Sequence, residues 1–219
     1  MFYTPTMVFE VPTRFGEYLI AAIIIMLAPG PSVLFTIARA ISWGRAAAVA
    51  TVLGNALGMF VLSLAVAFGL GPVLQRSDAA FLFVQIAGGG YLIYLGIDAI
   101  RKSVIHAEDM INVNEGKPTI LKSIRDGFFV GALNPKGLVF FAAILPGFVD
   151  HDSDSITSQI VLMGATFAIL AFFSDSTWGL IAGTIRESLS TKPARLVKMR
   201  KFGGLVMIAL GLFTISTAF

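Results

Sequence analysis

The sequence predicts an all-α integral membrane protein with six transmembrane helices, arranged as two inverted three-helix repeats with broken helices 1 and 4. Three observations lead to this fold. The chain of 219 residues is 56% hydrophobic and only 13% charged, whereas about a quarter of the residues in a soluble domain are charged. Two long apolar segments are interrupted at mid-length by proline and glycine. A glycine-rich motif occurs once in each half of the chain.

Segments of about 20 apolar residues can cross the hydrocarbon core of a bilayer, and such segments must be helical because an open sheet leaves unpaired edges in lipid. The expected spans are 17–40, 46–72, 79–100, 127–149, 156–184 and 202–219. A cleaved signal peptide has a basic start and a short apolar run. Here Arg14 is accompanied by Glu10 and Glu17, and the apolar run continues to residue 41. We therefore expect the N-terminus to be retained.

The first span is broken at Pro29-Gly30-Pro31. Each proline lacks a backbone donor and its ring crowds the preceding turn, while glycine adds backbone freedom. In hydrocarbon, the freed backbone groups are tolerated only where protein or water satisfies them. The break is therefore expected to face other spans or a cavity, with a simple kinked helix as the alternative.

The fourth span contains a second break, Asn134-Pro135-Lys136, which matches the first at an offset of 106 residues. The third and sixth spans share a pattern of paired and later glycines, at 88–96 and 203–211. Because each half has three spans, the second half must run antiparallel to the first. Inverted repeats with paired Pro/Gly interruptions indicate a secondary transporter with a site near the bilayer midplane.

We therefore expect one transmembrane transporter domain over residues 1–219, with repeats at 17–100 and 127–219 and a cytoplasmic linker at 101–126. The connections on one side of the membrane carry 13 of the 16 Lys and Arg residues. The positive-inside rule places that side in the cytoplasm, so both termini are expected on the outer, periplasmic side. Topology then explains the basic pI of about 9.3 without nucleic acid as a partner.

Two ionisable residues lie within predicted spans, Lys136 and Asp175. Such residues are costly in a membrane and are by default candidates for function. Asp175 could carry a coupling proton or bind a substrate amine, and Lys136 could bind a carboxylate. The alternatives are a structural Lys–Asp pair, or a position of Asp175 near the interface. Asn55 could bind substrate or tie two helices together.

Helix ends at the two breaks add partial charges to this region. A helix that restarts presents free N–H groups that suit a carboxylate, and the freed carbonyls suit an ammonium group. A zwitterionic amino acid carries both groups. The candidate substrate and coupling residues are Pro29, Gly30, Pro31, Asn55, Asn134, Pro135, Lys136 and Asp175.

Several motifs together resemble the LysE/RhtB-type amino-acid exporter family of bacteria, over almost the whole chain. They are Pro29-Gly30-Pro31, Gly44-Arg45, Tyr91-Leu92-x-x-Leu95-Gly96, Asn134-Pro135-Lys136, Phe140-Phe141 and Leu145-Pro146-x-Phe148. The resemblance implies a multi-pass protein of the inner membrane that exports amino acids or close analogues, driven by proton motive force.

One position departs from the pattern of that family. Many members carry an acid after the glycine of the second span, where this chain has Met59 after Gly58. If that acid contributes to coupling in other members, then Asp175 must suffice here, or the coupling or the substrate differs.

Two other functions remain open. A cation or metal exporter of a related family would prefer several acids within the spans, and only Asp175 is evident. A membrane-embedded enzyme would need a nucleophile with a base, or metal ligands; Ser174-Asp175-Ser176 is the nearest candidate, and no histidine lies in a span. We expect a transporter rather than an enzyme, without a cofactor or metal.

The expected partners are the substrate, protons and the lipid bilayer. The chain has no cysteine, which excludes disulfides and thiolate metal sites. Glycine pairs such as Gly54 with Gly58 and Gly179 with Gly183 are expected to be helix contacts. The glycine-rich faces also suggest a homodimer.

Overall fold

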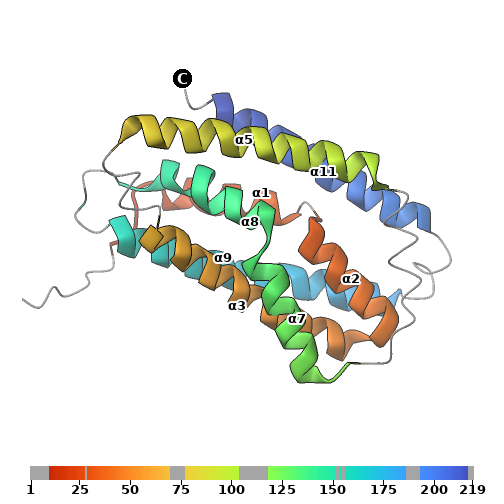
Figure 1. Ribbon diagram of the computed structural model, residues 1–219. Coiled ribbons are helices and arrows are strands. Elements are labelled where there is room, and N and C mark those ends of the chain that lie inside the picture. The colour runs from red at the N-terminus through yellow and green to blue at the C-terminus, as the bar shows by residue number, and fades with distance from the viewer. Residues whose placement is uncertain are drawn as a thin grey trace, which may run out of the picture.

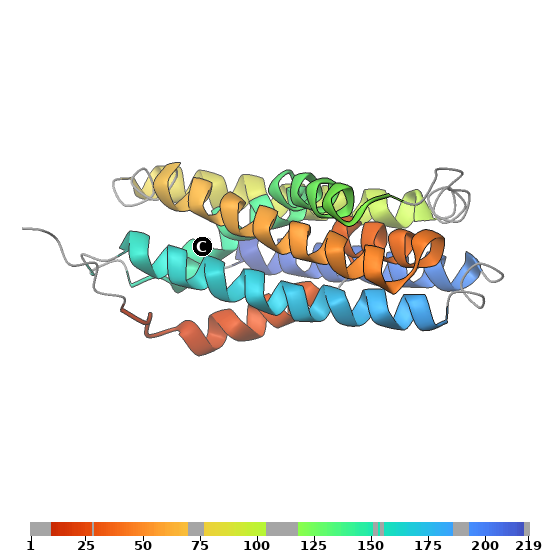
Figure 2. The ribbon, with the colours of Figure 1, turned by 90° about the horizontal axis from the view of Figure 1, so that it is seen from below.

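The computed structural model describes residues 10–27, 29–69, 77–103, 118–150, 153, 156–185 and 193–216. The regular elements in this part of the chain are all helical, and most run along one long axis (Figures 1 and 2). They are α1 Phe15–Leu27, α2 Pro31–Trp43, α3 Arg45–Gly69, α5 Asp78–Arg101, α7 Ile120–Ala132, α8 Pro135–Val139, α9 Ile156–Thr184 and α11 Pro193–Ser216.

Two of these helices, α3 and α9, are long and apolar enough to cross a bilayer, with 25 and 29 residues. Two bent pairs can each form one further span, which gives up to four candidate spans in the described residues. The pairs are α1 with α2, bent by 47°, and α7 with the helix that starts at Pro135, bent by 41°. The prediction of a helical membrane protein is therefore confirmed.

The second broken helix changes its winding after the break. Pro135 is the first residue of α8, where a missing N–H costs nothing. The Oδ1 atom of Asn134 caps this start by accepting hydrogen bonds from the backbone N–H groups of Lys136 (3.0 Å) and Gly137 (3.4 Å). The helix continues as a π-helical turn at Phe140–Ile144 and a 3-10 turn at Leu145–Phe148.

Helices α5 and α11 pack against each other through reciprocal contacts of their glycines. A Cβ added to Gly89 would lie 2.8 Å from the carbonyl oxygen of Gly211, and one added to Gly211 would lie 2.5 Å from that of Gly89. Gly96 and Gly204 are related in the same way, at 2.5 and 2.6 Å. The order of these contacts shows that the two helices run antiparallel. Bare glycines thus let the two backbones touch.

The glycines of α3 and α7 form a second close helix pair. A Cβ at Gly54 would lie 1.9 Å from the carbonyl oxygen of Ile124, and a Cβ at Gly131 would lie 2.2 Å from that of Asn55. The glycines that suggested a homodimer therefore make helix contacts within the chain. The homodimer stays a prediction, and these glycine faces give it no support.

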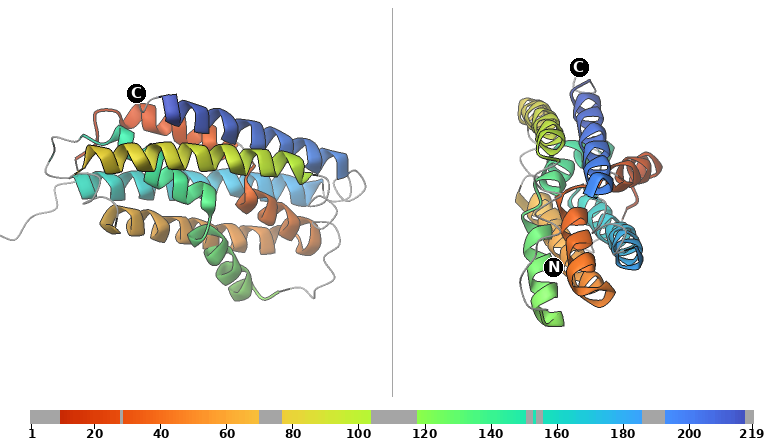
Figure 3. Two further views of the ribbon diagram at one scale, coloured as in Figure 1. Left: turned by 45° about the horizontal axis from the view of Figure 1, so that its top comes forward. Right: turned by 90° about the vertical axis from the view of Figure 1, so that its right-hand side faces the viewer.

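The helices are stacked in three levels, which the end-on view in Figure 3 separates. The pair α5 and α11 covers α1 and α8, and α3 and α9 lie on the far side of these two. The largest buried apolar cluster fills the middle of this stack and contains the aromatic rings of Tyr18, Phe140, Phe141, Phe148 and Phe167. One half of each broken span, α1 and α8, therefore lies between continuous helices.

Two helices begin more than one helical turn earlier than the sequence predicted. The fourth span was expected from residue 127, but α7 begins at Ile120 because the side chain of Thr119 caps it, accepting from the Lys122 N–H at 3.2 Å. The last helix was expected from residue 202 and begins at Pro193. Both extensions are amphipathic or basic, so a search for apolar runs does not include them. Of the predicted linker at 101–126, residues 104–117 lie outside the described residues, and residues 120–126 belong to α7.

Candidate functional site

The two broken spans meet at Gly30 and Lys136. A Cβ added to Gly30 would lie 3.1 Å from Cδ and 3.2 Å from Nζ of Lys136. The lysine side chain thus lies across the bare Cα of the glycine. Each of the two residues follows the first proline of its break, so the two interruptions are in direct contact.

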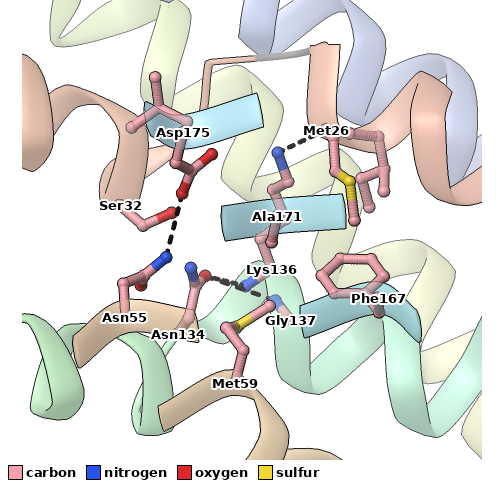
Figure 4. Close-up of a pocket in the computed structure, with 12 residues that line it drawn as sticks. Met26, Ser32, Asn55, Met59, Asn134, Lys136, Gly137, Phe167, Ala171 and Asp175 are labelled. Carbon is pink, nitrogen blue, oxygen red and sulfur yellow. Dashed lines mark hydrogen bonds between the residues drawn. The ribbon is translucent and has the colours of Figure 1, made fainter. Parts of the chain in front are cut away.

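A small cavity lies beside this contact (Figure 4). Its volume of about 20 Å³ is room for about one water molecule. Residues from α1, α2, α3, α8 and α9 surround it together with Asn134 of the second break. The lining residues are Ile25, Met26, Ser32, Val33, Asn55, Met59, Asn134, Lys136, Gly137, Phe167, Ala171 and Asp175.

The ammonium group of Lys136 replaces a backbone donor that the first break removes. Its Nζ donates a hydrogen bond to the carbonyl oxygen of Ile25 at 2.7 Å, and the side chain is buried. In a continuous helix this carbonyl would accept from the N–H of residue 29. That residue is Pro29, which has no N–H. A backbone carbonyl of the first broken span therefore binds the ammonium group of the second.

The carboxylate of Asp175 lies in the same cavity and is held by α3. Its Oδ2 accepts a hydrogen bond from Nδ2 of Asn55 at 3.0 Å, and both side chains are buried. Lys136, a residue of opposite charge type, lines the same cavity. The Oδ1 atom of Asn55 is buried without a hydrogen-bond partner among the described residues, so it can accept one from a ligand.

The sequence-predicted residues cluster around this point. Asn55, Asn134, Lys136 and Asp175 line the cavity, and Gly30 lies against its lysine. Asp175 is thus buried in the interior of the bundle rather than exposed at one end of α9. The other three predicted residues are the prolines, which shape the backbone.

Pro29 and Pro31 line a second cavity, of about 50 Å³, on the other face of the first break. Leu95, Asp98 and Met207 lie around it, from α5 and α11. Asp98 is paired with Lys102 at 2.7 Å. The two cavities therefore flank the first break, and Gly30 is part of the wall of the second.

An ion pair that the sequence analysis missed joins the two broken spans near one end of the bundle. Arg39 of α2 donates to Oδ2 of Asp126 in α7 at 2.9 Å. The guanidinium carbon lies 4.6 Å from the ring centre of Phe35 and 4.3 Å from that of Trp43. Arg39 is one of the 13 Lys and Arg residues that the charge count places in cytoplasmic connections, but it lies within α2 and is buried. The spacing of four residues between Phe35, Arg39 and Trp43 was the available signal.

The opposite end of the bundle is closed by polar contacts between the start of α1 and the end of the second broken span. The backbone N–H of Thr13 donates to Oδ2 of Asp150 at 3.0 Å, and Arg14 donates to the carbonyl oxygen of Gly147 at 2.7 Å. Deeper in the bundle, the Tyr18 hydroxyl donates to the carbonyl oxygen of Met163 at 2.6 Å. Polar contacts therefore join the two broken spans at both ends of the bundle. Within the described residues, no group of three His, Asp or Glu side chains comes close enough to hold a metal ion.

Comparison with known proteins identifies one family and several relatives that match most of this chain. A family model described as "LysE type translocator" matches residues 23–217. A homoserine/homoserine lactone efflux protein of Salmonella typhimurium is 27% identical over 191 residues, which are 87% of this chain and 91% of the relative. A leucine efflux protein of Enterobacter is 26% identical over 192 residues, 87% of each chain. An uncharacterized membrane protein of Bacillus subtilis is 24% identical over 90% of this chain and 96% of its own length. No solved structure matches the chain.

Proposed function

Because this chain belongs to the LysE type translocator family, we propose that it is a secondary transporter that exports amino acids or close analogues across the bacterial inner membrane, coupled to protons. The observation that carries the proposal is the cavity between the two broken spans, which is lined by one buried lysine and one buried aspartate. The relatives named as efflux proteins for homoserine and leucine support the same substrate class.

The charges of the cavity match those of a zwitterion. The substrate carboxylate binds Lys136, and the substrate ammonium binds Asp175 together with the unpartnered Oδ1 of Asn55. Hydrogen bonds between charged groups are about twice as strong as neutral ones. Substrate entry then replaces the contacts that these side chains make with Ile25 and with each other.

Asp175 is the residue that couples protons to export in this proposal. Its carboxylate can bind either a proton or the substrate ammonium, and not both at once. A proton that arrives from outside releases the ammonium outward, and loss of that proton to the cytoplasm prepares the site for the next substrate. Acids buried inside membrane helices serve as proton carriers in many transporters.

Six spans in two inverted repeats give the site its access from both sides. The reciprocal contacts of α5 and α11 support this arrangement, because Gly89 meets Gly211 while Gly96 meets Gly204. Such pairs are expected when a twofold axis relates two antiparallel helices. Both termini then lie outside. A reporter fused after Phe219 is expected to give a periplasmic signal, and a cytoplasmic signal would contradict the six-span topology.

The conformation described above is the occluded state of the proposed cycle. A cavity of about 20 Å³ does not hold an amino acid, so the cavity must widen when substrate enters. The ion pair of Arg39 with Asp126 closes the cytoplasmic side in this scheme, and the contacts of Thr13 and Arg14 close the outer side. Alternate opening of the two sides around a fixed site is the general behaviour of secondary transporters.

The test is uptake of a panel of radiolabelled amino acids into inverted membrane vesicles with an imposed pH gradient, acidic inside. In this orientation export appears as uptake. The proposal predicts uptake of at least one amino acid that collapses when an ionophore removes the pH gradient. Absence of uptake for the whole panel, with the protein present in the vesicles, would contradict it.

A further inference from the structure

The wall of the cavity has polar residues around Asp175 at one side and apolar residues at the other, and Lys136 lies between the two groups. Figure 4 shows Asp175, Ser32 and Asn55 together at one side, with Met26 and Phe167 at the other. Met59 lies below them in this view, beside Gly137. If the charged groups bind the backbone atoms of an amino acid, the apolar side is left for its side chain. This inference rests on the function proposed above.

Two glycines determine where Met59 lies: Gly58 sets the position of its backbone, and Gly137 leaves room for its side chain. A Cβ on the preceding residue, Gly58, would lie 2.1 Å from the carbonyl oxygen of Phe128, so α3 is pressed against the backbone of α7 and cannot rotate there. A Cβ on Gly137 would lie 2.6 Å from Cε and 2.7 Å from Sδ of Met59. The thioether therefore rests over the bare Cα of Gly137, at the edge of the cavity.

The charge balance of the site restricts the substrate side chain. The ammonium and carboxylate of a bound amino acid engage Asp175 and Lys136, the two charged residues that line the cavity. A lysine or arginine side chain would bring a third charge against Met26, Met59 and Phe167, all of which are buried. A buried charge without a partner is strongly unfavourable. An apolar side chain meets no such penalty.

We propose that Met59 is the specificity-determining residue of this transporter, and that its thioether selects neutral amino acids with apolar side chains over basic ones. Methionine suits this position because its unbranched side chain has three rotatable bonds. It fills the small cavity when the site is empty and moves aside when a substrate side chain enters. Phe167 and Met26 complete the apolar wall.

The test compares the initial rates of leucine, phenylalanine and lysine uptake in inverted vesicles for the wild type, Met59→Asp, Met59→Ala and Leu57→Ala. Leu57 is on the same helix but exposed on its outer surface, so it is the matched control. We expect the wild type and Leu57→Ala to prefer leucine. Met59→Asp should raise the ratio of lysine to leucine uptake at least tenfold. Met59→Ala should raise the ratio of phenylalanine to leucine uptake, because the shorter side chain enlarges the cavity without adding a charge.

Different outcomes separate this inference from the proposed function. Wild-type vesicles that take up leucine and lysine equally would overturn the inference and leave amino-acid export intact. The same holds if both Met59 variants transport with wild-type ratios. Should Met59→Asp fail to accumulate in the membrane, Met59→Ala alone decides, since a truncation at an adaptable side chain is better tolerated. Failure of the wild type to transport any amino acid would overturn both.

Discussion

The side chain of Lys136 lies across Gly30, so that the second broken span closes over the first at the bare Cα between two prolines. The ammonium then reaches the carbonyl oxygen of Ile25, which Pro29 has deprived of its helical donor. Lys136 thus donates the hydrogen bond that the backbone of the first break lacks, and it also brings a positive charge to the cavity.

Replacement of Gly30 tests this relationship. In Gly30→Ala the new methyl group would stand 3.1 Å from Cδ of Lys136, which forces the lysine to shift by a few tenths of an ångström. We expect export to fall roughly tenfold, because small displacements of binding groups have large effects on rate. The control is Gly16→Ala in α1, where a Cβ meets nothing within 4 Å. Equal export by the two variants, at equal protein levels, would contradict the prediction.

Replacement of Asp175 tests proton coupling. Asp175→Asn keeps the shape of the side chain and its contact with Asn55, but the amide can carry neither a negative charge nor a transferable proton. Export driven by a pH gradient should be lost while the protein still accumulates and elutes as a single species in detergent. Glu17→Gln makes the same chemical change at an exposed position of α1 and should retain export. Wild-type flux in Asp175→Asn would remove this residue from the mechanism.

The neighbouring glycines of α5 test the helix contact. Gly89→Ala would place a methyl group 2.8 Å from the carbonyl oxygen of Gly211, whereas a Cβ at Gly90 meets nothing within 4 Å. We expect Gly89→Ala to lower the free energy of unfolding by about 1–3 kcal/mol, as overpacked sites do. Gly90→Ala should be neutral or stabilising, since alanine favours a helix by up to about 1 kcal/mol. Thermal unfolding in detergent measures both, and equal melting temperatures would count against the close approach of α5 and α11.

The ion pair of Arg39 with Asp126 predicts coupling between α2 and α7. The single variants Arg39→Gln and Asp126→Asn each remove one partner of this ion pair, so each should destabilise the protein. The double variant should lose less free energy of unfolding than the two single variants lose together, with a coupling energy of about 0.5–3 kcal/mol. A double-mutant cycle on thermal unfolding measures it. The exposed pair of Arg14 and Glu17 is the reference, where little coupling is expected. Additive effects at Arg39 and Asp126 would show that the pair does not join the two helices.

Local backbone chemistry made the breaks predictable. Proline removes a hydrogen-bond donor wherever it occurs, so Pro29 and Pro135 indicated the two interruptions. Charged residues are rare in apolar segments, so Lys136 and Asp175 stood out as candidates. The glycine pattern related α5 to α11 as counterparts in the two halves, although the contact between them was not predicted. Each of these signals lies in a short stretch of the sequence.

Other features depend on pairs of residues far apart in the chain. Arg39 was counted as a loop residue, because nothing near it in the sequence indicates that Asp126 would reach it from α7. Met59 attracted notice only as a departure from a family pattern, and its place in the cavity depends on Gly137 beneath it. The early start of α7 was missed because its first turns carry Lys122 and Arg125 on an amphipathic helix.

The central claim is that the cavity between the two breaks is where the substrate binds. The chain has no cysteine, so a single cysteine can be placed at Ser32, which lines the cavity, and another at Leu57 as a control on the outer surface of α3. The measurement is the rate at which a membrane-permeant maleimide labels each variant, with and without the amino acid that the wild type transports fastest. We predict that the amino acid slows labelling of Ser32→Cys severalfold and leaves Leu57→Cys unchanged. Labelling of Ser32→Cys at the same rate with and without the amino acid, in a variant that still transports it, would contradict the account.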